Sequence, residues 1–227
     1  MNSSLDQGHQ VLALFIDYKK AFDTLDNEVL LQAMDECGIK GPTNRWFRSY
    51  LSGRTLQTYI SGVAGKEVVV QLGVPTGSVY GPVGFVMHVN SVINVVKKCR
   101  VYMYADDMCL MYSSKNIKEI RAVRQADFDS IIRWAHDNGI ILNLNKTKVM
   151  HLYSPHNLVA KNVKSVDIGI VGHTYECMHV KNVNCVCQKL EYVSKFKYLG
   201  LWVDRNMNWK TQVDTVCTKL VGKGSVE

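Results

Sequence analysis

The sequence predicts an α/β (α+β) protein in which a mainly antiparallel sheet is backed by helices. Short apolar runs of strand length recur along the chain, and longer segments with apolar residues at helical intervals lie between them. Two of the short runs flank a tight polar turn, which favours antiparallel pairing. The 227 residues can bury a substantial core, and 47% apolar with 21% charged residues is ordinary for a globular protein.

The first expected strand is the uninterrupted apolar run Val11–Ile16. Apolar residues at every position, rather than at alternate ones, are typical of a strand that is covered on both faces. The run ends in Asp17, so we expect a carboxylate at the end of a buried strand.

Two helices are expected next. Asp26 can cap a helix that extends to about Glu36 and is closed by Gly38. A second, shorter helix over 43–51 carries three aromatic residues. The apolar face of the first helix is predicted to consist of Val29, Leu30, Ala33 and Met34.

A hairpin and a buried helix follow in the prediction. The two strands of the hairpin are rich in β-branched and aromatic residues, and a glycine-containing segment separates them. The helix begins at a proline, which is tolerated in a first turn. The expected ranges are 56–60 and 68–72 for the strands, 62–65 for the turn and 82–96 for the helix.

Two adjacent carboxylates, Asp106 and Asp107, lie between the apolar runs Arg100–Met103 and Met108–Tyr112. The pattern predicts a hairpin with both carboxylates at its tip. Ionised carboxylates held this close repel one another unless a cation binds, and hard oxygen ligands suit Mg²⁺. The other interpretation is an ordinary solvated turn, since Asp is common in turns.

The rest of the chain predicts one long helix and several short strands. Apolar residues at near-helical intervals predict an amphipathic helix over 116–136, which Gly139 can end. Strands are expected near 140–142 and 149–153, and hairpins over 165–204.

At this point the motifs resemble a known family. In order along the chain they are Phe15–Asp23, Gly73–Pro82, Tyr104–Asp107, Leu142–Lys148 and Phe196–Gly200. They are similar to the consecutive palm motifs and the primer grip of reverse transcriptases, in the form found in non-LTR (LINE-like, jockey-type) retrotransposons.

The resemblance extends from about Val11 to about Lys219 and implies a polymerase palm with a small C-terminal β-hairpin region. It places a palm over 1–155 and a β-rich primer-grip region, leading into a truncated thumb, over 156–227. The fingers strands that precede Asp17 in the family are expected to be missing. An endonuclease domain is also expected to be missing, so other portions or another protein chain would have to supply these parts.

The resemblance assigns the metal and catalytic roles. Asp17, Asp106 and Asp107 would hold two Mg²⁺ ions, with Mn²⁺ as the alternative ion, and the backbone carbonyl of Tyr18 would be a further ligand. Two ions would activate the primer 3′-hydroxyl and stabilise the leaving pyrophosphate. Lys146 would lie near the triphosphate, where it could neutralise charge or donate a proton.

The nucleotide-binding residues implied by the resemblance are Ala21, Phe22, Pro75, Thr76 and Gly77. The ring of Phe22 would exclude a ribose 2′-hydroxyl by steric contact. Threonine at position 76 departs from the family, in which glutamine is usual, and its shorter side chain cannot make the same amide contacts. The alternatives are a packing phenylalanine and an ordinary turn.

The resemblance also assigns the primer and template contacts, to Tyr104, Tyr198, Leu199 and Gly200. The last three would position the primer end, and a strand ending in a glycine turn is compatible with that role. Recognition should be mostly of the backbone and the A-form shape, because a polymerase must accept every sequence.

The expected function is therefore that of an RNA-directed DNA polymerase module, which transfers a nucleotide from a dNTP to a primer annealed to an RNA template. The alternative is an inactive or domesticated palm remnant that binds nucleic acid or protein. A metal-dependent phosphodiesterase is less favoured, because it would not need the downstream motifs. A formal charge of +7 favours a polyanionic partner only weakly.

Composition also bears on location. No apolar run approaches the ~20 residues needed to cross a membrane, and the N-terminal residues show no signal-peptide pattern. We therefore expect an intracellular protein, nuclear or cytoplasmic, with no membrane partner.

A group of cysteines and histidines raises the question of zinc. Their intervals do not match repeated CxxC pairs, and residues on a twisting hairpin alternate faces, so a structural zinc is not expected. We expect half-buried strand cysteines in the reduced state and exposed histidines instead. The residues are His173, Cys177, His179, Cys185 and Cys187.

Overall fold

The computed structural model describes residues 2–75, 77–154, 156–157, 160, 162–163, 169–180 and 187–221, and for residues 2, 3, 179 and 180 only the secondary structure. The chain forms two compact units, each assembled from separate stretches of sequence. The first unit consists of Met1–Asp17, Val96–Ser130 and Asn143–Glu227. The second consists of Tyr18–Val95 and Ile131–Leu142.

A five-stranded sheet with the order β11-β8-β1-β7-β6 is the centre of the first unit. Its middle strand, β1 (Gln10–Ile16), pairs antiparallel with β7 (Asp107–Ser114) and with β8 (Lys148–Leu152). The edge strand β6 (Arg100–Tyr104) is also antiparallel, whereas β11 (Glu191–Tyr192) pairs parallel with β8. All seven residues of β1 are buried, which confirms the prediction of a strand covered on both faces.

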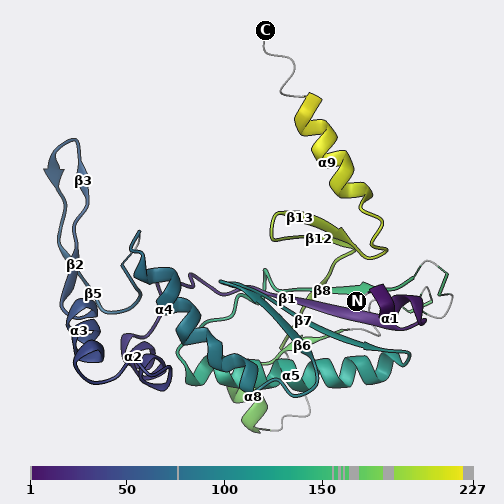
Figure 1. The fold of residues 1–227 in the computed structure, drawn as a ribbon, viewed down its shortest axis with the longest axis horizontal. Helices are drawn as coiled ribbons and strands as arrows, with labels where there is room; N and C mark the ends of the chain where they lie inside the picture. Colours follow the sequence, from purple (N-terminus) through teal and green to yellow (C-terminus); the bar gives the residue numbers. More distant parts are fainter. Residues whose placement is uncertain are drawn as a thin grey trace. The chain divides into compact units, whose positions relative to one another are not determined.

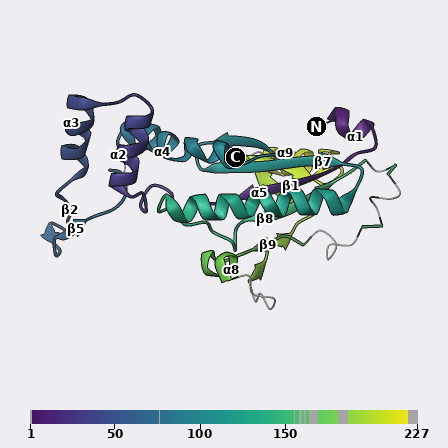
Figure 2. The same cartoon turned by 90° about the horizontal axis from the view of Figure 1, so that it is seen from below.

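The long helix α5 (Ile117–Asp137) begins in the first unit, and its part up to Ser130 covers one face of this sheet (Figures 1 and 2). Arg124, which is fully buried, donates from its guanidinium to the carbonyl oxygens of Leu12 and Leu110, at 2.8 and 2.5 Å, and so ties the helix to two strands. Asn116 caps the helix by accepting from the Lys118 N–H at 3.0 Å, and Gly139, at φ +66°, follows its end. These bounds confirm the predicted amphipathic helix.

A two-stranded hairpin of β12 (Lys195–Tyr198) and β13 (Leu201–Asp204) covers the other face (Figure 1). The ring of Phe196 stacks on Phe15 of β1 with 4.4 Å between centroids. Because side chains alternate along a strand, Val11, Ala13 and Phe15 share this face. The remaining described elements of the unit are α1 (Asn2–Asp6), β9 (Val171–Gly172), α8 (Tyr175–Val180), β10 (Gln188–Lys189) and α9 (Lys210–Val221).

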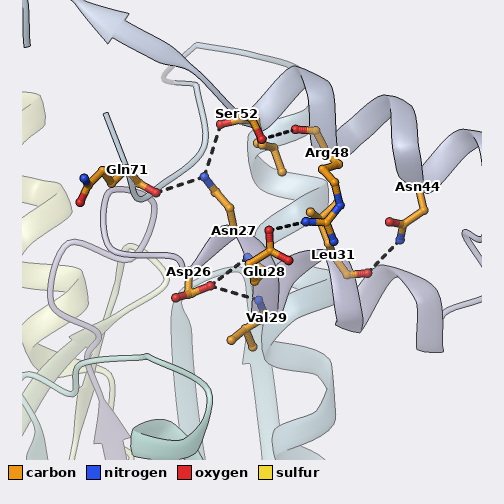
Figure 3. A network of polar contacts seen from close by, with 10 residues as sticks. Asp26, Asn27, Glu28, Val29, Leu31, Asn44, Arg48, Ser52 and Gln71 are labelled. Carbon is orange, nitrogen blue, oxygen red and sulfur yellow. Dashed lines mark hydrogen bonds and ion pairs between the residues drawn. The ribbon is translucent and has the colours of Figure 1, made fainter. Parts of the chain in front are cut away.

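The second unit is built on α2 (Asn27–Glu36), α3 (Gly41–Leu51) and α4 (Tyr80–Val89). Asp26 caps α2 as predicted, accepting from the N–H groups of Glu28 and Val29 at 2.8 and 3.2 Å (Figure 3). Polar contacts then join α2 to its neighbours in the same view. Arg48 pairs with Glu28, Asn44 donates to the Leu31 carbonyl, and Asn27 donates to the carbonyls of Leu51 and Gln71.

Several element predictions differ from the structure in detail. Leu31 rather than Val29 joins Leu30 and Met34 on the buried face of α2. The helix predicted to begin at Pro82 begins at Tyr80 and continues after Val89 as a 3₁₀ helix, η1 (Asn90–Asn94).

The predicted glycine-rich hairpin also differs. It consists of two short ladders, and its turn lies at Ser61–Gly62, where both residues have positive φ, rather than over 62–65. The ladders pair β2 (Arg54–Leu56) with β5 (Val68–Val70), and β3 (Tyr59–Ile60) with β4 (Val63–Ala64).

In place of a strand over 140–142, Leu142 makes an isolated bridge with Tyr18. The region predicted as hairpins contains the helix α8 in addition to its strands. Across the described residues, no helix is long and apolar enough to cross a membrane.

Candidate active site

Asp17 lies immediately after β1, at the end of the central strand. Its backbone is held on both sides by one turn of the chain. The Asp17 carbonyl accepts from the Asn143 N–H at 2.8 Å, and its N–H donates to the Thr147 hydroxyl at 3.3 Å. The Thr147 hydroxyl in turn donates to the Asn143 carbonyl at 2.9 Å, so one buried side chain fixes the position of the strand end.

Asp106 and Asp107 lie at the tip of the β6–β7 hairpin, as predicted. Tyr104 pairs with Asp107, which leaves Ala105 and Asp106 as a two-residue turn, with Ala105 at φ +51°. The β1–β7 register pairs Ile16 with Met108, so its next position places Asp17 opposite Asp107. Directly opposite residues of an antiparallel pair have Cβ atoms about 4.5–5.5 Å apart, so two carboxylates meet at one end of the sheet.

The electrostatics of this end favour a cation. Burial, followed by the nearby charges of Asp106 and Asp17, raises the pKa of Asp107 above its usual range. The Oδ2 atom of Asp17 is buried and has no hydrogen-bond donor among the described residues. A buried carboxylate oxygen without a donor is costly, and a divalent cation would satisfy it. The donor set of carboxylate oxygens therefore fits a hard divalent ion.

A pocket of about 260 Å³ opens beside these carboxylates, within the first unit. Asp17 and Asp107 lie in its wall with Lys146, Lys148 and Tyr198. Lys148 is paired with Glu191 at 2.5 Å, whereas Lys146 lies in the exposed turn that Asn143 begins. The predicted lysine therefore shares a pocket with two of the three predicted carboxylates, while Asp106 lies outside the pocket wall.

Tyr198 forms another side of the pocket from the β12–β13 hairpin. Its ring centroid is 5.3 Å from that of Phe15, and burial, with the nearby Cys109 and Asp107, raises its pKa to about 12. The turn that follows consists of Leu199 and Gly200, at φ +48° and +83°. This is the strand ending in a glycine turn that the sequence predicted, and it presents a half-exposed Leu199 at the hairpin tip.

In the second unit, the predicted nucleotide-binding residues come from two segments that are hydrogen-bonded to each other. The N–H groups of Gly73 and Val74 donate to the carbonyls of Leu25 and Phe22 at 2.7 and 3.0 Å. A Cβ on Gly73 would lie 2.7 Å from the Phe22 oxygen, so only glycine allows this approach. The ring of Phe22 is half-buried and lies 5.1 Å from that of Phe85.

The other predicted residues are placed as follows. Ala21 is half-buried, Pro75 is half-buried, and Gly77 is exposed at φ +79°. Thr76 lies outside the described residues. Tyr18 is buried and bridges to Leu142, and the Tyr104 side chain is 70% exposed at the end of β6.

Sequence reasoning missed two positioning residues. Thr147 was part of a motif but had no role, because nothing in its sequence context shows that its hydroxyl reaches the N–H of Asp17. Arg54 donates to the carbonyls of Leu51 and Gly73 and so braces the glycine segment from β2. Both residues bond to backbone atoms, and any residue type can supply such atoms. The sequence therefore does not show which residues they contact.

Comparison with known proteins agrees with this geometry. A family model described as "Reverse transcriptase (RNA-dependent DNA polymerase)" matches residues 2–203. The chain is 25% identical over 215 residues to a 115 kDa protein in the type-1 retrotransposable element R1DM of Drosophila melanogaster, covering 93% of the chain and 18% of that protein. It is 21% identical over 222 residues to the RNA-directed DNA polymerase from the mobile element jockey of the same species, covering 94% and 22%.

The chain thus spans about a fifth of the length of these curated relatives. Among solved structures it is similar to apo telomerase from Candida tropicalis, with a TM-score of 0.53 and 12% identity, covering 88% of the chain and 35% of the telomerase chain. At this identity the likeness concerns the fold alone, and the sheet backed by helices is a polymerase palm-like fold.

Proposed function

Because the chain belongs to the reverse transcriptase (RNA-dependent DNA polymerase) family, we propose that it acts as an RNA-directed DNA polymerase module of a non-LTR retrotransposon. The reaction transfers a nucleotide from a dNTP to the 3′-hydroxyl of a primer annealed to an RNA template. The observation that carries the proposal is the meeting of Asp17 and Asp107 at matching ends of β1 and β7, beside the pocket that Lys146 lines.

The carboxylates of Asp17, Asp106 and Asp107 would hold the divalent ions that the family uses, with the Tyr18 carbonyl as a further ligand. Oxygen ligands alone favour Mg²⁺, with Mn²⁺ as the alternative. Bound there, such ions supply Lewis-acid stabilisation of the charge that develops on the transferring phosphoryl group. The raised pKa of Asp107 and the unpartnered Oδ2 of Asp17 support this assignment.

The other roles belong to side chains around the carboxylates. Lys146 would meet the triphosphate, where its ammonium offsets negative charge on the leaving pyrophosphate. Tyr198, Leu199 and Gly200 would hold the primer end through the hairpin tip, and Tyr104 would contact the primer or template.

Nucleotide selection would fall to residues of the second unit. Phe22 would exclude a 2′-hydroxyl, with Ala21, Pro75, Thr76 and Gly77 shaping the surface around the incoming nucleotide. The close backbone approach of Gly73 to Phe22 supports a concerted role for these two segments.

The test is primer extension on an annealed RNA template with Mg²⁺ and dNTPs. The parent chain is compared with the double variant Asp106→Asn/Asp107→Asn. A matched control, Asp35→Asn/Asp137→Asn, removes the same two charges from helices α2 and α5. We expect extension by the parent and by the control, and loss of extension by the site variant.

Two results would contradict the proposal. Heteroduplex binding by the parent without extension in either Mg²⁺ or Mn²⁺ would overturn the polymerase proposal and favour a palm remnant that binds without catalysing. Extension that persists in the site variant would show that these carboxylates do not hold the catalytic ions.

A further inference from the structure

Three potential metal ligands converge in the first unit, away from the carboxylates. His173 follows β9, Cys177 lies within α8 and Cys187 precedes β10, and their ligand atoms all lie within 4.8 Å of one another. The sequence suggested that these residues lie on hairpin strands and alternate faces. The structure differs because α8 turns Cys177 back toward the strands.

The local geometry explains the convergence. In the β9–β10 ladder Gly172 pairs with Gln188, so the next position of the register places His173 opposite Cys187. Cys177 is four residues after His173, and the Thr174 carbonyl accepts from the Met178 N–H at 3.2 Å as the chain enters its helical turn. One helical turn therefore returns the third side chain to the first two.

The distances and ligand types suit zinc. The Sγ of Cys177 lies 3.7 Å from the Nδ1 of His173. A tetrahedral zinc with Zn–S about 2.3 Å and Zn–N about 2.0 Å separates such atoms by about 3.5 Å. Two thiolates and an imidazole are soft and borderline ligands, which favour Zn²⁺ over Mg²⁺ or Ca²⁺.

The surroundings support an anionic sulfur. The backbone N–H of Thr174 donates to the Sγ of Cys187 at 3.4 Å, and the hydroxyl of Thr174 accepts from the Cys177 N–H at 3.2 Å. An N–H donor to sulfur stabilises a thiolate ligand, as outer-shell hydrogen bonds do in metal sites. All three ligand residues are half-buried, so an ion there would be partly shielded from water.

The segment is also too small to hold itself together. The β9–β10 ladder has two residue pairs, and α8 has six residues. An isolated two-stranded hairpin is marginal in water, and a helix this short does not form alone. A metal staple is a common solution for small elements of this kind.

We propose that His173, Cys177 and Cys187 form a structural zinc site that fixes α8 to the β9–β10 pair. Water or a further side chain completes the coordination. Each cysteine thiol releases its proton on binding the ion.

Hydrogen bonds and a strand connection also join the proposed zinc site to the five-stranded sheet. Gln188, next to Cys187, donates to the Asn145 side chain at 2.8 Å, and β10 leads directly into β11, which pairs with β8. Gln125 of α5 both accepts from the Val171 N–H and donates to the Val171 carbonyl, at 2.8 Å each. Ordering of this segment therefore extends to the turn that carries Lys146.

The experiment measures metal content in the full chain, purified under reducing conditions without chelators. We expect about one zinc per chain by mass spectrometry, and X-ray absorption showing two sulfur ligands. Co²⁺ added to the apo protein should give thiolate-to-cobalt charge-transfer absorption. Chelation should lower Tm, and Zn²⁺ but not Mg²⁺ should restore it.

The matched variants are Cys177→Ser and Cys187→Ser, with Cys37→Ser and Cys217→Ser as controls because these two cysteines are exposed and lie outside the cluster. The site variants should lose zinc and the cobalt absorption, and the controls should keep both. If a site variant fails to fold, the X-ray absorption and chelation results on the parent still decide.

Three outcomes would overturn the proposal. They are a parent chain that takes up neither Zn²⁺ nor Co²⁺, a bound zinc without sulfur ligands, and a disulfide between Cys177 and Cys187 in the reduced preparation. None of these measurements depends on polymerase activity, so the zinc site and the proposed function stand or fall separately.

Discussion

The hydroxyl of Thr147 links the two stretches of chain that meet at Asp17, the carboxylate at the centre of the candidate site. It accepts from the Asp17 N–H and donates to the Asn143 carbonyl, and Thr147 is completely buried. Valine has a similar shape but no hydroxyl, so Thr147→Val leaves a buried N–H without its partner. Such a loss costs about 1–3 kcal/mol.

We predict that Thr147→Val lowers the rate of primer extension roughly tenfold, which corresponds to about 1.4 kcal/mol. The reason is that Asp17 is no longer held at its position. Single-turnover extension measures the effect. The control is Thr215→Val in α9, because the Thr215 hydroxyl also donates to a carbonyl four residues earlier, at 2.7 Å. Equal losses in both variants would argue against a positioning role.

Asp107 should make the metal-free chain less stable as the pH rises. Its pKa is raised in the folded chain by burial and by the charges of Asp106 and Asp17. Below the usual Asp pKa the carboxyl is protonated in both states, and the folded state carries no penalty. Stability is then lost as the pH rises through the raised pKa, because folding opposes ionisation.

We therefore predict that, in chelator, Asp107→Asn has a higher Tm than the parent at neutral pH and that the difference vanishes near pH 3. Thermal melts across this range measure it. Asp6→Asn, which removes an exposed carboxylate from α1, is the control and should show a smaller change. Added Mg²⁺ should stabilise the parent more than the Asp107 variant, and the opposite order would contradict the metal assignment.

Phe22 should determine which sugar is accepted. We predict that Phe22→Val increases the use of ribonucleotides relative to deoxynucleotides by about tenfold or more, because the 2′-hydroxyl no longer meets a ring. Competitive incorporation assays measure this ratio. Phe47→Val is the control, since Phe47 packs on Trp46 and Tyr80 in the same unit. An unchanged ratio in the Phe22 variant would leave only a packing role for this ring.

At the scale of elements, the glycine segment after β5 depends on close backbone contact. Gly73 and Gly62 have nearly the same φ, +80° and +81°, but a Cβ at Gly73 would meet the Phe22 and Asp23 carbonyls, whereas one at Gly62 meets nothing within 4 Å. Comparing an alanine at Gly62 with an alanine at Gly73 therefore separates the cost of a positive φ from the cost of steric contact.

We predict that Gly62→Ala costs about 1–2 kcal/mol of unfolding free energy. Gly73→Ala should cost about 1–3 kcal/mol more, because the new methyl group forces the two segments apart. Denaturant unfolding measures both variants. Equal costs would mean that the segment relaxes without strain, and the close approach would then have no mechanical importance.

Sequence patterns predicted correctly those helices and strands whose formation depends on residues close together in the sequence. The Asp26 cap, the asparagine start and glycine end of α5, and the apolar run of β1 all depend on residues near in sequence. The 3₁₀ continuation after α4 and the helix α8 were missed, because weak local preferences there are overridden by packing. Alternation on a strand argued against zinc at Cys177, and this argument does not apply because Cys177 lies in the helix α8.

At the scale of the whole molecule, the net charge of +7 leads to a prediction about salt. We expect affinity for an RNA–DNA heteroduplex to fall at least about tenfold between 50 and 200 mM salt, which corresponds to about two or more phosphate contacts. Filter binding across salt concentrations measures the slope. Lys146→Gln should reduce the slope by about one contact, and Lys40→Gln, which removes a surface ion pair with Asp35, should leave it unchanged. A flat salt dependence would contradict binding through the phosphate backbone.

The candidate site was predictable in outline because Asp17 and Asp107 lie at strand ends, and strand ends can be located from apolar runs. Once β1 is paired with β7 in its observed register, Asp17 and Asp107 are neighbours, and no other information about the fold is needed to predict this. Thr147 and Arg54 were not predictable, because each contacts backbone atoms of a residue brought close only by the complete fold. The division into a palm over 1–155 and a primer-grip region over 156–227 stays a prediction.

The pairing of β1 has a consequence for how the chain is made. Leu12 pairs with Tyr112 on one side and with His151 on the other, about 100 and 140 residues later. At about 5–20 residues per second, roughly 7 to 28 seconds separate the synthesis of Leu12 from that of His151. For part of that interval the apolar strand has left the ribosome without its partner strands. The strand that ends in Asp17 is therefore open to misassociation during translation, and a nascent-chain chaperone would have reason to shield it.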